Sequence, residues 1–282
     1  MAVLENEITF GIVLYKEELS HSVTFRSLLN SITAAGNTIN SKVIILVFDN
    51  TPREQNKKNN ETIAVNEWVE VHYYTINENK GLPFAYNLFG EKARELKKEW
   101  LVLLDQDTEL PLDFFSLYRT VNPEIKIHCP LVFSNGSLMS PAYYKNFRSS
   151  PMQVPQTESI DLKNVSCINS GLMINVEFFQ KIRGYNPDLF LDFCDHDFMY
   201  KAKKNDITRL GIIPCRLTQD FSSVSHTKEQ ALARYELFVK DLKTFYKDKD
   251  KIKIFFLVDL SRIISLTLKF KTLKIMKIRL KK

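Results

Sequence analysis

Short apolar segments alternate with helical patterns along the first half of the chain, and this alternation restricts the fold more than any other feature. Strand-like runs occupy residues 8–15, 42–48, 69–75 and 100–104. A helical pattern follows the first run, and another helix is expected over residues 85–96. Strands and helices that alternate at such intervals form βαβ units, whose strands lie parallel. We therefore predict an α/β protein with a mainly parallel central sheet flanked by helices.

The second half of the chain is less regular. Residues 53–62 form a polar loop in our prediction, and residues 140–165 are rich in Ser, Pro and Asn. We expect the latter to be a long loop that forms a lid or an acceptor wall, with disorder as the alternative. A short helix is predicted over residues 175–182 and a long helix over residues 228–246.

The fourth strand ends in two carboxylates, Asp105 and Asp107, which are separated by one residue. Side chains alternate along an extended chain, so both are expected on the same side. Like charges at close range raise each other's proton affinity unless a cation lies between them, and hard divalent cations prefer carboxylate oxygens. The pair therefore indicates a metal site at the end of a strand, where open α/β sheets bind ligands. Asp107 or Thr108 capping a helix after Pro111 is the alternative.

Composition places the chain among ordinary globular proteins. Its 282 residues are 44% hydrophobic and 26% charged, which suits a packed core rather than a disordered chain. The four cysteines have no zinc-ligand spacing and indicate free thiols in a reducing compartment. The N-terminus lacks the features of a signal peptide, and no uninterrupted apolar run is long enough to span a bilayer. We therefore expect a cytoplasmic location.

The net charge of +6 is concentrated at the C-terminus. Residues 251–282 contain ten Lys and Arg residues and the single acid Asp259, so the remainder of the chain is slightly acidic. A body without a basic face is not expected to bind nucleic acid. Leu260, Ile264 and Leu268 recur at helical spacing in this basic tail, which is typical of a helix on an anionic membrane surface. Packing on the preceding domain, a dimer contact and a solvated terminus are the alternatives.

Six short motifs occur in order along the chain. They are Val13-Leu14-Tyr15, Asp49-Asn50, residues 79–87 (NKGLPFAYN), residues 104–108 (LDQDT), Asn169-Ser170-Gly171 and residues 189–198 (LFLDFCDHDF). Together they resemble the family-2 glycosyltransferases of GT-A fold, most closely the bacterial rhamnosyltransferase-like members, over residues 8–245. The resemblance implies a GT-A catalytic domain with a Rossmann-like sheet over residues 1–250. Residues 251–282 then form a basic, amphipathic, helical C-terminal extension.

The resemblance also implies how a nucleoside-diphosphate sugar would bind. The residues matched to donor contacts are Leu14, Tyr15, Asp49, Asn79, Gly81, Asn87 and Asp105. Asp49 would accept a hydrogen bond from the base or ribose, although an Asx turn before Pro52 explains this residue too. Gly81 would allow the backbone to approach the donor closely, but a plain strand-to-helix turn also favours glycine.

The same resemblance implies a Mg²⁺ or Mn²⁺ site formed by Asp105, Asp107 and His226. In the family this cation neutralises the charge that develops on the nucleoside diphosphate as the glycosidic bond breaks. Imidazole is a suitable third ligand for Mn²⁺. A solvent-exposed loop histidine is an equal alternative for His226.

Asp195 matches the general base of the family, which takes a proton from the acceptor hydroxyl as that oxygen attacks the anomeric carbon. Because the base and the leaving group lie on opposite faces of the sugar, one displacement inverts the anomeric configuration. Ser170, Gly171 and Asp197 are expected to bind the acceptor. The alternative for the acids in this segment is a helix N-terminus, which acidic side chains stabilise.

These features predict an inverting, metal-dependent glycosyltransferase that is peripheral on the inner face of the cell membrane. It would transfer a sugar, with L-rhamnose as the first candidate, from a dTDP- or UDP-linked donor. The acceptor would be a hydroxyl of a bacterial surface glycan, such as an O-antigen or a capsule, or of a lipid-linked oligosaccharide. Cys194 and Lys201 differ from the Glu or small residue and the Arg that the family usually has, which leaves donor and acceptor choice open.

Two other functions are compatible with parts of the sequence. A sugar-phosphate nucleotidyltransferase usually has a Gly-rich loop before a basic residue to bind the triphosphate, whereas Gly11 stands alone in the first strand. A non-catalytic glycan- or membrane-binding scaffold of the same fold would not need Asp105, Asp107 and Asp195, which are all present.

Overall fold

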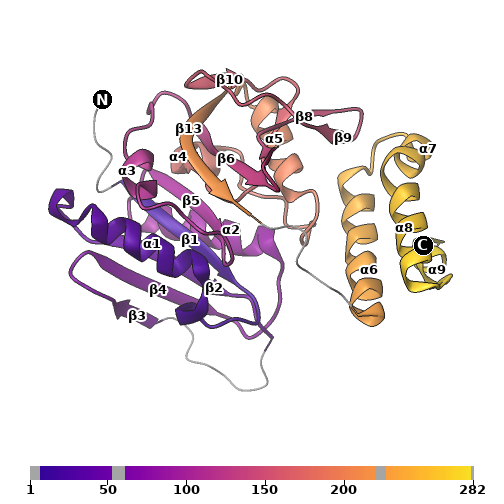
Figure 1. Ribbon diagram of the computed structural model, residues 1–282, viewed down its shortest axis with the longest axis horizontal. Coiled ribbons are helices and arrows are strands. Elements are labelled where there is room, and N and C mark those ends of the chain that lie inside the picture. Colours follow the sequence, from indigo (N-terminus) through magenta and orange to yellow (C-terminus); the bar gives the residue numbers. More distant parts are fainter. Residues whose placement is uncertain (1–6, 53–60, 220–226, 281–282) are drawn as a thin grey trace.

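The computed structural model describes residues 7–52, 61–219 and 227–280 of the chain. A twisted sheet crosses the molecule with helices on both faces, and a further layer of C-terminal helices lies beside it (Figure 1). This is the α/β architecture with flanking helices that the alternating sequence pattern predicted.

Parallel strands form the N-terminal half of the sheet. They are β1 (Ile8–Leu14), β2 (Val43–Asp49), β4 (Val69–Thr75) and β5 (Trp100–Asp105). They lie side by side in the order β5-β1-β2-β4. Most of their side chains are buried, as expected for parallel strands covered by helices on both faces. All of these strands were predicted from the sequence.

The other half of the sheet is mixed. β12 (Leu172–Asn175) runs antiparallel between β5 and β6 (Ile127–Ser134), and β13 (Arg209–Thr218) lies parallel to β6. The edges of the described sheet are β3 (Glu61–Ala64) and β10 (Ser159–Asp161). Because β12 is antiparallel to β5, the residues that precede β12 lie beside the carboxyl end of β5.

The prediction of a long loop over residues 140–165 was wrong. This part of the chain contains β7 (Ser137–Ser140), β8 (Ala142–Lys145), β9 (Arg148–Ser150), β10 and β11 (Val165–Ser166). β7 pairs with β6, whereas β8 pairs with β9 and β11 in a second, small sheet. These strands are short and partly exposed, so they lack the sustained apolar alternation that identifies a strand in a sequence.

Helices cover the two faces of the central sheet. One face carries α1 (Val23–Ala34), which 3₁₀ turns flank at Leu19–His21 and Gly36–Thr38, and α3 (Phe114–Tyr118). The other face carries α2 (Leu82–Glu95), α4 (Val176–Lys181) and α5 (Cys194–Lys204). Side chains of β5 alternate between the two cores, with Leu101 and Leu103 in one and Val102 and Leu104 in the other.

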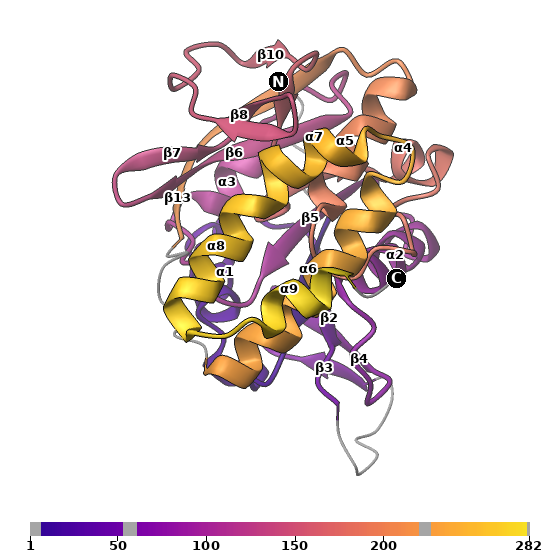
Figure 2. The same cartoon turned by 90° about the vertical axis from the view of Figure 1, so that its right-hand side faces the viewer.

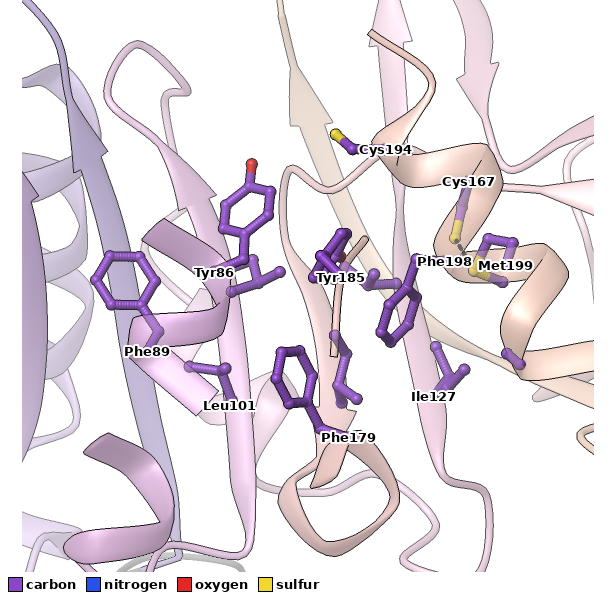
Figure 3. Packing of buried hydrophobic residues seen from close by; sticks show 14 of the residues in the cluster. Tyr86, Phe89, Leu101, Ile127, Cys167, Phe179, Tyr185, Cys194, Phe198 and Met199 are labelled. Carbon is purple, nitrogen blue, oxygen red and sulfur yellow. Dashed lines mark hydrogen bonds between the residues drawn. The ribbon is translucent and has the colours of Figure 1, made fainter. Parts of the chain in front are cut away.

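The core under α2, α4 and α5 is rich in aromatic rings (Figure 3). Tyr185 lies among Tyr86, Phe179 and Phe198, with its ring stacked on Phe198 at a centroid distance of 4.5 Å. All four cysteines are buried free thiols, as the sequence predicted. Cys129, Cys167 and Cys194 pack as small apolar side chains in this core, and Cys215 does so in the core under α1 and α3.

The C-terminal residues fold into a helical layer. It consists of α6 (Lys228–Phe245), α7 (Lys251–Ile254), a π-helical turn (Phe255–Asp259), α8 (Leu260–Phe270) and α9 (Lys274–Leu280). Figure 2 shows α6, α8 and α9 lying in front of the central sheet. Buried side chains from the tail, including Ile263 and Ile275, form one apolar cluster with Tyr235 and Leu242 of α6. The tail therefore packs on α6.

A buried carboxylate joins the helices of this layer. Asp259 is fully buried, accepts a hydrogen bond from Tyr235 Oη at 2.7 Å and pairs with Arg279 of α9.

No helix in the described part of the chain is both long enough and apolar enough to cross a membrane.

Candidate active site

The candidate site lies where the parallel strands end. Leu14 is opposite Asp49 at the ends of β1 and β2, and Asp105 ends the strand on the other side of β1. The antiparallel direction of β12 places Ser170 next to Asp105. Open α/β sheets bind ligands at this edge, and the carboxylate pair lies at the strand end where we predicted a metal site.

Two cavities open at these strand ends and share Asp105. The Asp107 cavity has a volume of about 640 Å³ and is lined by the ends of β1 and β5, the segment before α2, and α6. The Asp195 cavity has a volume of about 400 Å³ and is lined by Asn169, Ser170 and the start of α5. Leu82, Leu191 and Gln219 also border both cavities. Ligands in the two cavities would therefore meet at Asp105.

Asp105 and Asp107 both line the Asp107 cavity. Asp105 Oδ2 accepts a hydrogen bond from Ser170 Oγ, and Gln219 Nε2 lies 3.5 Å away. Burial raises the pKa of Asp105; the Ser170 hydrogen bond opposes this shift, and the charge of Asp107 adds to it. Asp107 is exposed. Neither Asp107 nor Thr108 caps a helix, because α3 begins only at Phe114.

Gln106, between the two carboxylates, joins the ends of β5 and β1. The Tyr15 amide donates to Gln106 Oε1 at 2.6 Å, and Gln106 Nε2 donates to the Tyr15 carbonyl at 3.3 Å. The Tyr15 side chain is 41% exposed and lines the Asp107 cavity beside Lys16. An exposed aromatic ring and a cation at one wall can contact a nucleotide base and a phosphate.

Asn79 and Gly81 line the same cavity. The Gly81 amide donates to Asn79 Oδ1 at 3.0 Å, and Gly81 has a φ of 82°. A β-carbon at Gly81 would lie 2.3 Å from the carbonyl oxygen of Phe190. The close backbone approach that we expected at this glycine therefore exists, but the chain segment around Phe190 makes it.

Asp49 is fully buried at the end of β2 and does not line the Asp107 cavity. Its carboxylate accepts hydrogen bonds from Tyr73 Oη at 2.7 Å and from the Thr51 amide at 3.1 Å. The second bond is the Asx turn that we considered as the alternative. Asn50 lines the cavity instead, and its Oδ1 accepts from the Lys80 amide at 2.7 Å.

Leu14 and Asn87 line neither cavity. Leu14 is part of the core under α1. Asn87 holds the backbone of Tyr185, because its Oδ1 accepts from the Tyr185 amide at 2.8 Å and its Nδ2 donates to the Tyr185 carbonyl at 3.0 Å. Both residues support the scaffold of the site rather than its surface.

Asp195 lies in the first turn of α5 and lines the Asp195 cavity with Ser170 and His196. Its Oδ1 accepts a hydrogen bond from the His196 amide at 2.7 Å. This position fits both explanations that the sequence left open. A helix N-terminus stabilises an ionised carboxylate, and the ionised form is the one that a general base requires.

Two residues that were predicted to bind the acceptor lie outside both cavities. Asp197 and Gly171 line neither cavity. Burial raises the pKa of Asp197, and the charge of Lys201 opposes this shift. Gly171 has a φ of 79°, and a β-carbon there would lie 2.7 Å from Tyr118 Oη, so packing requires the glycine. His226 lies outside the described residues.

A buried carboxylate from α6 holds the segment that leads to Asp195. Asp241 is fully buried and accepts hydrogen bonds from the amides of Phe190, Leu191 and Asp192 at 2.9, 2.8 and 2.8 Å. We did not predict this role from the sequence. The available signal was an acid on the apolar face of α6, since a lone buried carboxylate is stable only when donors satisfy it.

Arg234 of α6 is a second residue that the sequence analysis missed. It pairs with Asp192 through two hydrogen bonds, one of them 2.7 Å from Nη2 to Oδ1, and it lines the Asp107 cavity. Among the described residues that line this cavity, Lys16 is the other cation. The Asp107 cavity therefore carries both carboxylates and fixed positive charge.

His196 connects the Asp195 cavity with the small sheet. Its Nδ1 lies 2.7 Å from Ser166 Oγ, and its ring stacks on Tyr144 at a centroid distance of 4.0 Å. Tyr144 Oη lies 2.7 Å from Tyr246 Oη at the end of α6. Part of the segment that we expected to form an acceptor wall thus supports a residue of this cavity.

A metal would need ligands beyond the described side chains. Among residues 7–52, 61–219 and 227–280, no three His, Cys, Asp or Glu side chains converge on a point that could hold a cation. Asp105 and Asp107 offer two carboxylates at one cavity. This set fits Mg²⁺ or Mn²⁺, because such ions are commonly bound by one or two carboxylates together with the phosphates of a substrate.

The fold is shared with solved glycosyltransferases. GalNAc-T7 with UDP, GalNAc and Mn²⁺ matches with a TM-score of 0.59 at 14% identity, over 95% of this chain and 55% of that chain. Staphylococcus aureus TarS 1–349 in complex with UDP-GlcNAc matches with a TM-score of 0.51 at 12% identity, over 93% and 80%. The mannosyltransferase PcManGT from Pyrobaculum calidifontis, with GDP-Man and Mn²⁺, has a TM-score of 0.51 at 11% identity, over 96% and 77%. The chain has the GT-A fold.

The GT-A fold confirms the predicted fold class. This chain spans about half the length of the GalNAc-T7 chain. No family model matches the sequence, and no curated protein matches it either. At these low identities the likeness establishes the GT-A fold alone.

Proposed function

We propose that this chain is an inverting, metal-dependent glycosyltransferase that uses a nucleoside-diphosphate sugar. The observation that carries the proposal is the meeting of the Asp107 and Asp195 cavities at Asp105. A donor in the Asp107 cavity would direct its sugar toward the Asp195 cavity, where an acceptor hydroxyl would approach Asp195. The fold shared with proteins solved with UDP, UDP-GlcNAc or GDP-Man supports a nucleotide-sugar donor.

The lining of the Asp107 cavity suits a nucleoside diphosphate. Tyr15 offers an exposed ring to the base, while Asn50 and Asn79 offer side-chain amides at the same cavity. Lys16 and Arg234 would bind phosphate oxygens, and Asp192 holds the Arg234 guanidinium in position.

Asp105 and Asp107 would hold Mg²⁺ or Mn²⁺ together with oxygens of the diphosphate, with His226 as a further ligand. When bound, the cation neutralises the charge that develops on the diphosphate leaving group. Asp107 is exposed at the cavity and is therefore accessible to such a cation. Ser170 orients Asp105 at the boundary between the two cavities.

Asp195 would act as the general base. A bond forms between the acceptor oxygen and the anomeric carbon while the bond from that carbon to the diphosphate oxygen breaks. The hydroxyl proton passes to the Asp195 carboxylate. Attack from the side opposite the leaving group inverts the anomeric configuration.

The sequence resemblance supports the choice of donor and acceptor, and the surface of the tail supports membrane binding. The donor would be dTDP- or UDP-L-rhamnose, and the acceptor a lipid-linked or surface glycan. Exposed apolar side chains gather on α8, α9 and their connection: Ile264, Leu268, Leu273, Met276 and Leu280. Lys269, Lys271, Lys274 and Lys277 lie among them. Exposed apolar side chains that alternate with lysines along the tail support peripheral binding to the anionic inner face of the cell membrane.

Calorimetric titration with UDP and dTDP, with and without Mn²⁺, tests the proposal. We expect binding that depends on Mn²⁺ in the wild type and is lost in Asp107→Ala, because the variant lacks an exposed carboxylate at the cavity. A screen of nucleotide sugars for hydrolysis then identifies the donor. Absence of metal-dependent nucleotide binding in the wild type would instead favour a non-catalytic scaffold.

A further inference from the structure

The basic tail contributes a side chain to the Asp195 cavity. Arg262 of α8 borders this cavity beside Phe238 of α6. Its guanidinium carbon lies 3.9 Å from the centroid of the Phe238 ring. A cation–π contact of this kind holds the guanidinium over the ring and leaves its N–H groups free to donate hydrogen bonds to a ligand.

Arg262 has no anionic partner in the described part of the chain. The carboxylates that act on it electrostatically, Asp192 and Asp259, are paired with Arg234 and Arg279 respectively. Burial lowers the pKa of Arg262, and the charge of Asp192 opposes this shift. A partly buried cation without a paired anion is unfavourable unless a ligand supplies the missing charge.

The charges around the cavity restrict where such a ligand can lie. Among the described residues that line the Asp195 cavity, Arg262 is the only Lys or Arg, while Asp105, Asp192 and Asp195 are acids. An anionic group on an acceptor would be repelled by the aspartates and attracted to the Arg262 side. The hydroxyl of the same acceptor would then be directed toward Asp195.

We propose that Arg262 forms a phosphate subsite in the Asp195 cavity and that the acceptor carries a phosphate or diphosphate group close to its reactive hydroxyl. This inference rests on the proposed function and names the acceptor class. A guanidinium binds phosphate through two parallel N–H···O bonds, which fixes orientation as well as position.

Calorimetric titration of phosphate probes tests the subsite. Farnesyl diphosphate represents a lipid-linked acceptor, glycerol phosphate represents a glycan phosphodiester, and glucuronate is the carboxylate comparison. Each probe is titrated with UDP and Mn²⁺ saturating, which fills the Asp107 cavity, and again without them. The wild type is expected to bind at least one phosphate probe, and Arg262→Gln to weaken that binding about tenfold or more.

Two further variants make the result specific. Arg262→Lys keeps the charge but loses the planar guanidinium that donates two parallel hydrogen bonds. Its affinity for the phosphate probe should therefore lie between those of wild type and Arg262→Gln. Arg216 stacks on Phe133 at 3.7 Å and lines neither cavity, so Arg216→Gln should bind as the wild type does. Thermal unfolding of each variant shows whether it is folded, and Arg262→Lys decides the case if Arg262→Gln is not.

The outcomes separate this inference from the proposed function. Preference for farnesyl diphosphate identifies a lipid-linked acceptor, and preference for glycerol phosphate a phosphodiester glycan. Equal affinity of wild type and Arg262→Gln, no phosphate binding by a wild type that binds UDP, or an Arg262-dependent response to glucuronate alone overturns the subsite. A wild type that fails to bind UDP with Mn²⁺ overturns the proposed function, while the titrations without UDP still test Arg262.

Discussion

At the scale of single residues, Asp105 combines a central position with an unfavourable environment. It borders both cavities, yet burial raises its pKa and so disfavours the ionised form that a cation would need. A carboxyl group whose pKa is raised by folding contributes stability below its unfolded pKa of about 3.9. That contribution is lost as the pH rises through the folded pKa, so ionised Asp105 destabilises the ligand-free protein at neutral pH.

We therefore expect Asp105→Asn to raise the melting temperature at neutral pH while it abolishes Mn²⁺-dependent UDP binding. The difference in melting temperature should shrink as the pH falls through the raised pKa of folded Asp105, and it should vanish below the unfolded pKa of about 3.9, where the carboxyl group is protonated in both states. Thermal unfolding over a pH series, together with calorimetry, measures both effects. Asp188→Asn, at an exposed residue, serves as the control. A lower melting temperature of Asp105→Asn at neutral pH would contradict this explanation.

Asp195 and Asp197 provide a matched pair on one helix. Only Asp195 lines a cavity, so Asp195→Asn should leave donor binding intact and lower turnover by about 10²–10⁴-fold, the usual contribution of a general base. Asp197→Asn should leave turnover near the wild-type value. Initial rates with the donor identified by the hydrolysis screen measure both. Near-normal turnover of Asp195→Asn would assign the base to another residue.

The sequence located these residues along the chain better than it located their side chains in space. Motif order identified Asp107 and Asp195, which line the cavities. Asp49 and Asn87 belong to the same set of motifs, but Asp49 is hydrogen-bonded to Tyr73 and Asn87 to the backbone of Tyr185. Such partners come from distant parts of the chain, so no local pattern reveals them.

At the scale of elements, α6 and the segment at residues 190–192 form one unit. Asp241 accepts all three backbone amides of that segment, and the Phe190 carbonyl accepts from the Leu82 amide at the start of α2. The position of Asp195 along the following helix thus depends on a carboxylate more than forty residues later in the chain.

We expect Asp241→Ala to lower the free energy of unfolding by roughly 3 kcal/mol, because it leaves buried amide donors without an acceptor. Asp241→Asn keeps an acceptor oxygen and should have an intermediate effect. Chemical denaturation measures both variants, with Glu236→Gln, at an exposed residue of the same helix, as the control. Unchanged stability of Asp241→Ala would show that the segment does not depend on this carboxylate.

The elements themselves were predictable where burial imposes a pattern. β1, β2 and β5 are buried on both faces, and their apolar runs identified them, whereas the alternating pattern of β4 identified that half-buried strand. β8 and β9 escaped prediction because their side chains are largely exposed and their pairing partners define them. The small sheet is a tertiary feature rather than a local one.

At the scale of the whole molecule, α8 and α9 expose apolar side chains that are not part of the protein interior. Leu268 and Leu273 are 71% and 67% exposed, while Ile275 and Ile278 on α9 are buried against α6. Substitutions at the exposed positions can therefore test membrane binding without unfolding the layer.

We expect Leu268→Ser combined with Leu273→Ser to release the protein from anionic vesicles, because burial of apolar side chains and attraction of lysines both contribute to such binding. Co-sedimentation with anionic and neutral vesicles at moderate salt measures this. Leu112→Ser removes an apolar side chain that is 65% exposed elsewhere on the molecule and should have no effect. Continued binding of the double variant would show that this surface is not the anchor.

The buried pairing of Asp259 with Arg279 has a practical consequence. Arg279 of α9 pairs with Asp259, the residue that precedes α8, so α9 holds α8 in place. Removal of α9 would therefore displace α8, and Arg262 with it, before the central strands lost any contact. A shortened protein could then remain folded and still bind nucleotide, yet lack the wall that Arg262 contributes to the Asp195 cavity.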